Sequence, residues 1–299
     1  MKAFTELFPL IGGPFTLCIG KFDGVHIGHR MILNTLIVTA GDYSAAAVAY
    51  SFEPRPGTPL LTSRDEKLAL FDKLGISSVV LAELNEELMA ITADQFIGRI
   101  AACGSLKAVA VGEGFRFGRG AAGDVAMLRQ LGSQYGFDVL EIPQVRLDGQ
   151  AVSSTSIRQC ILVGDVARAA LLLGREYSLS GRVLPGRQLA RKLGFRTANI
   201  LPPEGKVIPQ SGVYACYVET EGETWPAMVN IGVKPTINGS ELLIESHLIG
   251  FEGDLYGRVV TVRLVSRIRD EMKFESVEQL AAQMAEDRET TLRVLAHCG

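Results

Sequence analysis

Little in this chain suggests a secreted, membrane-bound or nucleic-acid-binding protein. Its five cysteines are odd in number and scattered, and none forms a CxxC pair, which argues against a disulfide framework or a structural zinc site. It lacks any apolar run of about 18 residues that could span a bilayer. The net charge of −3 offers no basic field for nucleic acid. We therefore expect a cytoplasmic protein with no nucleic-acid or membrane partner, and the sequence indicates no protein partner.

The 299 residues are enough for two domains. In the first half, short apolar runs alternate with helical patterns, which is typical of a parallel sheet covered by helices on both faces. We predict a Rossmann-like α/β domain over residues 1–175. Its predicted strands span 15–20, 45–51, 78–81, 107–112 and 138–142, and its predicted helices span 28–40, 64–74, 93–102, 125–135, 155–163 and 166–173.

After Gly174 the pattern changes to β-type runs that are separated by Gly, Pro and Asn turns without intervening helices. Such a pattern favours an antiparallel barrel or sandwich. We predict an antiparallel β-barrel domain over residues 176–299, which ends in a helix from Val277 to about Leu295. Its predicted strands span 177–184, 212–220, 225–231, 242–248 and 258–265.

The densest motif is GKFDGVHIGH, from Gly20 to His29, where the first predicted strand meets the first predicted helix. Ligands of parallel α/β sheets bind at that edge. Glycines such as Gly20 and Gly28 let the backbone approach phosphate oxygens, and a helix N-terminus supplies N–H donors. His26 and His29 are three residues apart and can face one point. There they would bind the phosphates of ATP and stabilise charge as pyrophosphate leaves.

A second polar segment, VSSTSIR, joins a β-type run to a helix at Val152–Arg158. Hydroxyls such as those of Ser154 and Thr155 can cap that helix, while Arg158 reaches one turn further in. Hydroxyls and a guanidinium together make a second phosphate clamp. Alone, the segment would be explained by an ordinary N-cap with a solvated arginine, so this interpretation depends on the histidine motif.

The two motifs together resemble the nucleotidyltransferase superfamily. The sequence His26–His29 is also the signature of class I aminoacyl-tRNA synthetases, but the chain is short for a synthetase and lacks their KMSKS loop and a basic tRNA-binding region. Four further segments, Ser51–Pro56, Leu61–Thr62, Val111–Gly118 and Gly164–Arg175, are similar to the prokaryotic bifunctional FAD synthetase family.

That family resemblance implies roles for residues on the flavin side of the pocket. Phe22, Asp23 and the loop that carries Phe115 and Phe117 are expected to shape it. Aromatic side chains suit stacking on an isoalloxazine ring, although two phenylalanines on their own are more often core residues.

In the second half, Arg191–Asn199 resembles the flavokinase motif that ends in Pro-Thr-Ala-Asn. Thr197 and Asn199 are two residues apart, so in an extended segment they share a face, and their oxygens suit Mg²⁺ that bridges ATP phosphates. By the same resemblance, Glu245 occupies the position of the catalytic base, which accepts the proton of the riboflavin 5′-hydroxyl. Further segments match the riboflavin kinase family at 211–215, 228–236, 253–257 and 268–274.

The resemblance covers nearly the whole chain and implies a bifunctional transferase. It would convert riboflavin to FMN and FMN to FAD, with ATP as co-substrate and Mg²⁺ as cofactor. One alternative is an FMN adenylyltransferase with a degenerate kinase domain, because Ala190 and Arg196 depart from the family pattern. A second alternative is a flavin-binding module without catalysis, against which the intact His26, His29 and Arg158 count.

Overall fold

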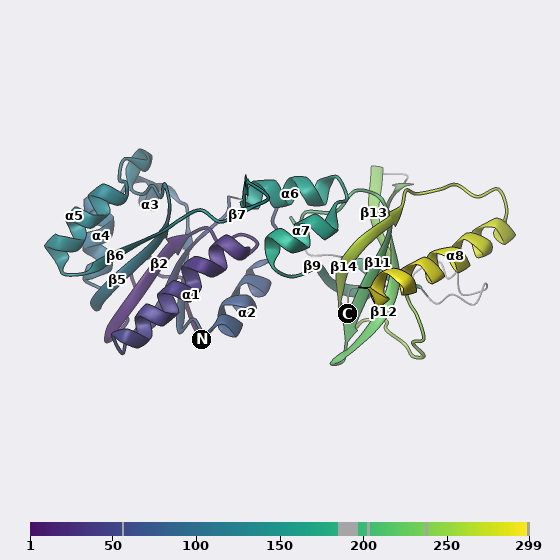
Figure 1. The fold of residues 1–299 in the computed structure, drawn as a ribbon, viewed down its shortest axis with the longest axis horizontal. Coiled ribbons are helices and arrows are strands. Elements are labelled where there is room, and N and C mark those ends of the chain that lie inside the picture. The colour runs from purple at the N-terminus through teal and green to yellow at the C-terminus, as the bar shows by residue number, and fades with distance from the viewer. Residues whose placement is uncertain (56, 185–196, 202–203, 237–238, 298–299) are drawn as a thin grey trace. The chain divides into compact units, whose positions relative to one another are not determined.

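The computed structural model describes residues 1–55, 57–184, 197–201, 204–236 and 239–297 (Figure 1). The chain divides into two compact units, Met1–Ser154 and Thr155–Gly299. This division falls just after the first residue of α6 (Ser154–Leu162), whereas the sequence predicts that the two functional domains meet after α7 (Val166–Leu173). The boundary at residue 175 stays a prediction about function, and Ala190 and Arg196 lie outside the described residues.

The first unit is built on a parallel sheet of six strands in the order β1-β4-β3-β2-β5-β6. The predicted α/β architecture is confirmed. The short strand β1, the helix α3 and the hairpin β7–β8 are not predicted from the sequence. The strands are β1 (Lys2–Phe4), β2 (Pro14–Gly20), β3 (Ala46–Glu53), β4 (Ser78–Glu83), β5 (Ser105–Gly112), β6 (Asp138–Ile142), β7 (Arg146–Leu147) and β8 (Gln150–Ala151).

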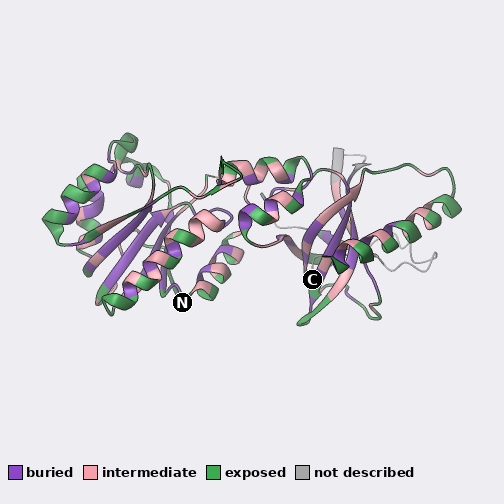
Figure 2. Cartoon of the chain, in the orientation of Figure 1, coloured by how far each residue is buried: buried purple, intermediate pink, exposed green. Residues whose placement is uncertain are grey.

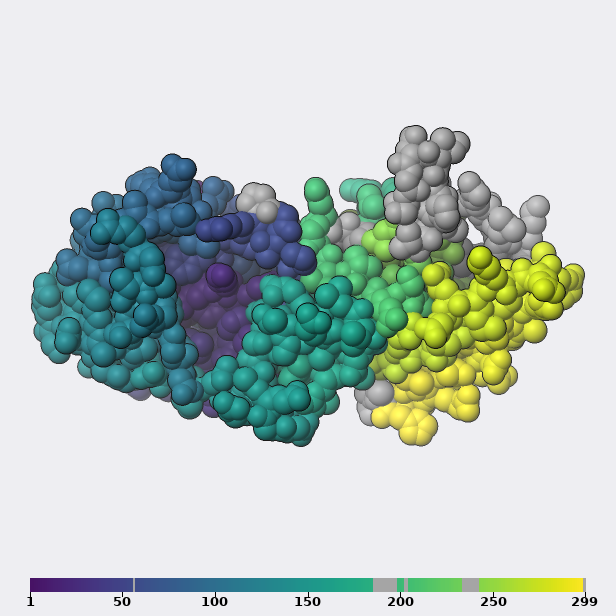
Figure 3. Space-filling model, turned by 90° about the horizontal axis from the view of Figure 1, so that it is seen from above, coloured from purple at the N-terminus to yellow at the C-terminus, as the bar shows by residue number. Residues whose placement is uncertain are grey.

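Helices cover both faces of this sheet because its central strands are apolar on both sides. On one face, Cys18 and Ala49 pack with α1 and α2, and on the other Leu17 and Tyr50 pack with α4 and α5. Figure 2 shows the central strands buried, and in Figure 3 the purple N-terminal residues lie largely beneath blue and teal residues. The helices are α1 (Ile27–Asp42), α2 (Arg64–Leu74), α3 (Glu86–Ala90), α4 (Ala93–Ala101) and α5 (Val125–Tyr135), with a short 3-10 helix at Arg119–Ala121.

The second unit contains a closed barrel in the order β10-β13-β12-β11-β14-β9. All its described pairings are antiparallel, so the predicted barrel is confirmed, and the terminal helix follows it. The strands are β9 (Tyr177–Leu184), β10 (Thr197–Leu201), β11 (Gly212–Thr220), β12 (Glu223–Thr236), β13 (Gly239–Leu248) and β14 (Val259–Arg269), and the helices are α6 (Ser154–Leu162), α7 (Val166–Leu173) and α8 (Val277–Ala296).

Candidate active sites

The glycine and histidine motif forms a tight loop between β2 and α1. Phe22 and Val25 have positive φ angles of 50° and 40°, and Gly24 has 85°. Such angles are uncommon for residues with a side chain and persist only where the surroundings hold them, often at functional sites. The loop therefore stands at the carboxyl end of β2 in a conformation that other segments stabilise.

Two distant segments hold this loop. The Asp23 carboxylate is 7% exposed and accepts hydrogen bonds from the backbone N–H groups of Leu61, at 3.0 Å, and Thr62, at 3.1 Å. The Gly24 N–H donates to Thr62 Oγ1 at 3.1 Å. Ser154 Oγ donates to the Asp23 carbonyl oxygen at 2.8 Å. Asp23 is thus a structural anchor of the loop, and its predicted part in flavin binding stays a prediction.

The two histidines of the motif lie against each other. His26 is the N-cap of α1, and its Nδ1 accepts a hydrogen bond from the His29 N–H at 3.2 Å. The two rings stack with centroids 3.6 Å apart and an angle of 16° between their planes. The predicted convergence of both side chains at the start of a helix is therefore found in the structure, although their role with ATP is not tested by it.

His29 favours its neutral form. Burial lowers its pKa well below 6.5, and the nearby positive charges of His26 and Lys67 lower it further. Its Nδ1 is buried and has no hydrogen-bond partner among the described residues, and an N–H⁺ left there without a partner would be costly. The site therefore presents a neutral His29 imidazole at the N-terminus of α1, where backbone N–H groups favour anions.

The two glycines make room for rings within the loop. A Cβ at Gly20 would lie 3.1 Å from the Phe22 ring, and a Cβ at Gly28 would lie 3.2 Å from the His26 ring. Both positions would crowd the loop if they carried a side chain. This packing reason adds to the predicted one, which is close approach of the backbone to phosphate.

The aromatic residues predicted on the flavin side are mostly core residues. Phe22 is 1% exposed and packs edge-on against His29 and Phe71. Phe117 is 5% exposed, while Phe115, stacked on it at 5.5 Å, is partly exposed. Of these three rings, Phe115 has the most surface to offer a ligand, and the flavin role of all three stays a prediction.

The predicted second clamp lies on and beside α6. Ser154 is its first residue and belongs to the first unit, where it contacts Asp23 as described. Thr155 is exposed and Arg158 is half-buried on the following turn, and both are grouped with the second unit. Their role toward the ATP phosphates stays a prediction.

Sequence reasoning missed Lys67, which is 3% exposed on the inner face of α2. Its Nζ lies 3.2 Å from Ser51 Oγ and 3.1 Å from Glu53 Oε1. A signal existed, because Lys67, Phe71 and Leu74 follow the i, i+4, i+7 spacing of a buried helical stripe. A lysine within such a stripe indicates a buried cation with a partner.

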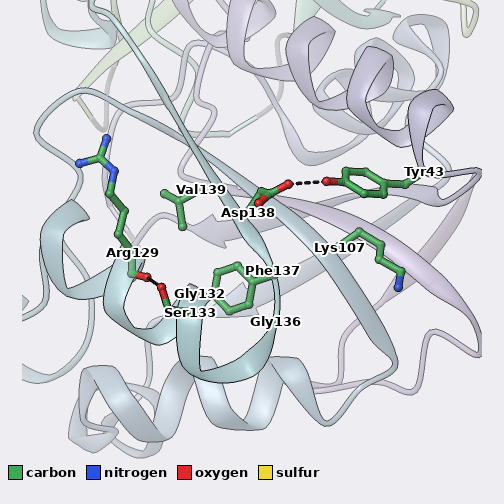
Figure 4. A pocket seen from close by; sticks show the side chains of 9 residues that line it. All are labelled: Tyr43, Lys107, Arg129, Gly132, Ser133, Gly136, Phe137, Asp138 and Val139. Carbon is green, nitrogen blue, oxygen red and sulfur yellow. Dashed lines mark hydrogen bonds between the residues drawn. The ribbon is translucent and has the colours of Figure 1, made fainter.

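A groove of about 570 Å³ lies elsewhere in the first unit (Figure 4). It is lined by Lys107, near the start of β5, by Asp138, at the start of β6, and by Tyr43 and Arg129. The Tyr43 hydroxyl donates to the Asp138 carboxylate. These residues mark the amino ends of the strands, whereas nucleotides in such sheets bind at the carboxyl ends. The groove is therefore not a candidate for the adenylyl-transfer site.

In the barrel, Glu245 lies in a row of polar residues that crosses three strands. It is in register with Asn199 of β10 on one side and with Asn230 of β12 on the other. Directly opposite residues share a face, and the alternate positions Ile244 and Ser246 are fully buried in the barrel. Glu245 therefore stands on the outer face of the barrel, beside the two asparagines.

The predicted metal ligands share this outer face. Thr197 precedes Asn199 by two residues on β10 and is in register with His247, although its side chain is outside the described residues. The described residues hold no cluster of three or more His, Cys, Asp or Glu side chains suited to a metal. A hydroxyl and an amide oxygen beside a carboxylate fit Mg²⁺, which keeps few protein ligands and takes others from phosphates and water.

Glu271 is a further carboxylate that sequence reasoning did not single out. Asn230 Nδ2 lies 3.5 Å from Glu271 Oε1, and a Cβ at Gly232 would collide with the Glu271 carboxylate. Glu271 follows β14, and its closeness to β12 could not be read from sequence distance. It adds negative charge to the surface beside Asn230.

Comparisons with known proteins match both halves of the chain. The FAD synthetase family model matches residues 13–156, and the riboflavin kinase family model matches residues 173–295. The bifunctional riboflavin kinase/FMN adenylyltransferase of Escherichia coli is 38% identical over 92% of this chain and 90% of its own length. The protein of the same description from Pseudomonas fluorescens is 37% identical over 90% of this chain and 89% of its own length.

A solved structure described as a macrolide-efflux protein from Streptococcus pneumoniae shares the architecture. It has a TM-score of 0.89 and 27% identity, and the match covers 97% of both chains. In the part of this chain that the structure describes, no helix is long and apolar enough to cross a membrane.

These matches decide between the alternatives that the sequence left open. The riboflavin kinase match extends through the barrel to residue 295, so nothing in the comparisons supports a degenerate kinase domain. The FAD synthetase match includes the histidine motif and reaches Ser156, which counts against a module without catalysis. The chain belongs to the bifunctional riboflavin kinase/FMN adenylyltransferase family.

Proposed function

We propose that this chain makes FAD from riboflavin in two ATP-dependent steps, one in each predicted domain. The barrel phosphorylates riboflavin to FMN, and the α/β domain joins FMN to an adenylyl group with release of pyrophosphate. The observation that carries the kinase assignment is the register of Glu245 with Asn199 on the outer face of the barrel. The stacked His26 and His29 rings at the start of α1 support the second assignment.

In the kinase step, the 5′-hydroxyl oxygen of riboflavin forms a bond to the γ-phosphorus of ATP, and the bond from that phosphorus to ADP breaks. Glu245 accepts the hydroxyl proton, as a general base within reach of the substrate would. Asn199 and Thr197 would hold Mg²⁺, which when bound neutralises charge on the phosphates. The side-chain oxygens of Asn199 and Thr197 would thereby help to position the γ-phosphate of ATP for attack by the riboflavin hydroxyl.

In the adenylyl transfer, an FMN phosphate oxygen attacks the α-phosphorus of ATP, and pyrophosphate leaves. His26 and His29 donate N–H hydrogen bonds to the phosphates, and Ser154, Thr155 and Arg158 bind them from the second motif. Gly20 and Gly28 keep the loop compact. Phe22, Asp23, Phe115 and Phe117 shape the flavin side of the pocket. Most of the rate comes from positioning and charge stabilisation.

The proposed chemistry defines the ligands of the chain, and we propose that it acts in the cytoplasm. The proposed ligands are ATP, riboflavin, FMN and FAD, with Mg²⁺ as the cofactor of both reactions. The four cysteines in the described part of the chain are free thiols, which agrees with the proposed reducing cytoplasm.

The test is chromatography of products after purified protein is incubated with Mg-ATP and either riboflavin or FMN. We expect riboflavin to yield FMN and FAD, and FMN to yield FAD, with both reactions lost in chelator and restored by Mg²⁺. E245Q should slow riboflavin phosphorylation about 100-fold or more and leave FMN adenylylation unchanged. The control E252Q changes an exposed carboxylate outside the site. Conversion of FMN without any use of riboflavin by the wild type would show that the kinase half is silent.

A further inference from the structure

Lys67 is a buried cation in the first unit that the proposed mechanism does not use. It lies on α2, four residues before the fully buried Phe71. These two are the buried residues of the helix, whose start is capped by Ser63 and Glu66. Long amines are almost never fully buried unless they are paired, so the position of Lys67 needs a reason.

The partners of Lys67 place its ammonium group at the carboxyl ends of the central strands. Ser51 and Glu53 are alternate residues at the end of β3, so they share a face. Lys67 Nζ contacts both, and Ser51 Oγ in turn donates to the Lys21 carbonyl oxygen at 3.3 Å. Gly20 is in register with Ser51. One network thus joins α2, β3 and the first residues of the histidine loop.

The same face of α2 also supports the histidines. Phe71 packs edge-on against Phe22 at 5.6 Å, and Phe22 packs edge-on against His29 at 5.2 Å. Lys67 is close enough for its charge to lower the pKa of His29, in addition to burial and His26. Both packing and charge therefore connect this helix face to the imidazole.

We propose that Lys67 is a positioning residue of the adenylyl-transfer site, which holds the start of the histidine loop through Ser51 and places a fixed positive charge behind His29. It does not touch the substrate, because it is buried beneath the loop. Its effect is to keep the His26–His29 stack in place for the phosphates of ATP. The inference rests on the proposed function of this site.

The charges around His29 allow a test in which two substitutions should shift the pKa of His29 in opposite directions. The titratable and charged groups of the surrounding elements are His26 at the N-cap of the same helix, Asp23 in the loop, Lys67 on α2 and Glu53 at the end of β3. K67M removes the positive neighbour, so the pKa of His29 should rise. E53Q removes the negative partner of Lys67, so the pKa of His29 should fall further.

The measurement is a pH titration of the imidazole Cε1–H signals by NMR in full-length protein with labelled histidine. The chain has four histidines, and H29Q assigns the signal. K73M is the matched control, since Lys73 is an exposed lysine on the same helix. We expect the His29 midpoint to move to higher pH in K67M, to lower pH in E53Q and not at all in K73M.

Activity assays on the same proteins separate a role in the site from a role in folding. K67M should lower kcat/KM for ATP in FMN adenylylation about 10- to 100-fold, K67R should recover part of the loss, and riboflavin phosphorylation should be unchanged. An unchanged His29 midpoint in both K67M and E53Q would overturn the inference, as would an equal loss of both activities. If K67M does not fold, the direction in which the His29 midpoint moves in E53Q decides whether the inference holds. A wild type without FMN adenylylation would instead contradict the proposed function, while the NMR result would still decide the coupling.

Discussion

A few polar residues within an apolar framework give the first unit its chemical character. His29 is buried in its neutral form, and Asp23 is buried as the acceptor of three separate donors, the N–H groups of Leu61 and Thr62 and the Thr62 hydroxyl. Burial of such groups costs free energy unless they are neutral or hydrogen-bonded. Asp23 is therefore held by its hydrogen-bond donors and His29 by remaining neutral, and we expect the loop to be sensitive to substitution at either residue.

At this scale we predict that His29 makes the first unit less stable in acid. Its pKa in the folded state lies below the ordinary 6.5, so above that pH both folded and unfolded states carry it neutral. As the pH falls below about 6.5, His29 becomes protonated in the unfolded chain but stays neutral in the folded state. The free energy of unfolding therefore drops by at most about 1.4 kcal/mol per pH unit.

Denaturant unfolding followed by circular dichroism between pH 7.5 and 5.5 checks this prediction. H29Q should lose less stability over this range than the wild type, because glutamine does not titrate. H297Q removes an exposed histidine from the end of α8 and should behave like the wild type. Equal acid sensitivity of wild type and H29Q would contradict the assignment.

Among the elements, α8 shows how a helix is fixed to the barrel. Asp287 is 3% exposed and accepts two hydrogen bonds from Arg269 at the end of β14, at 2.8 and 2.6 Å. Leu295 packs with Ala215 and Val265 at the C-terminal end of the helix. The ion pair also fixes the chain just before Glu271, which lies beside Asn230 of the proposed kinase site.

We predict that D287A destabilises the second unit by about 3 kcal/mol, the lower end of the range for a broken buried pair, because Arg269 keeps 19% side-chain exposure. The double variant R269M/D287L should recover most of the loss, since it removes both charges. The single tryptophan, Trp225, lies in β12 and reports unfolding of this unit by fluorescence. E289Q, which changes an exposed residue of the same helix, is the control. An unfolding midpoint of D287A equal to that of E289Q would refute the prediction.

The whole molecule joins two units that have separate cores and unrelated architectures. The sheet of the first unit is parallel and covered on both faces, while the second unit closes its strands into a barrel. The FAD synthetase model matches the first unit and the riboflavin kinase model matches the barrel, while residues 157–172 at the start of the second unit lie between the two matches. The two proposed sites therefore need not share residues to work.

For this reason we predict that two singly inactivated proteins complement each other. E245Q should adenylylate FMN but not phosphorylate riboflavin, and H29Q should do the reverse. A mixture of the two, given riboflavin and Mg-ATP, should form FAD because FMN released by one protein diffuses to the other. Chromatography would show FMN accumulating without FAD if FMN must pass directly between the sites of one molecule, provided that each variant keeps its own reaction.

The sequence by itself determined the fold classes, the order of most elements and the residues that gather at the histidine loop. These features are local: period-two and helical spacing, glycines at a strand end, and side chains three residues apart. The small elements β1, α3, β10 and the β7–β8 hairpin were missed, because each contains too few residues to show a periodic pattern.

The tertiary structure alone decided which distant residues stand together. It put Lys67 beneath the loop, made Phe22 and Phe117 core residues, and brought Glu271 next to Asn230. Strand register also set Asn199 and Asn230 on either side of Glu245. Contacts of this kind depend on how apolar faces pack and strands pair across long stretches of chain, and no local pattern in the sequence contains that information.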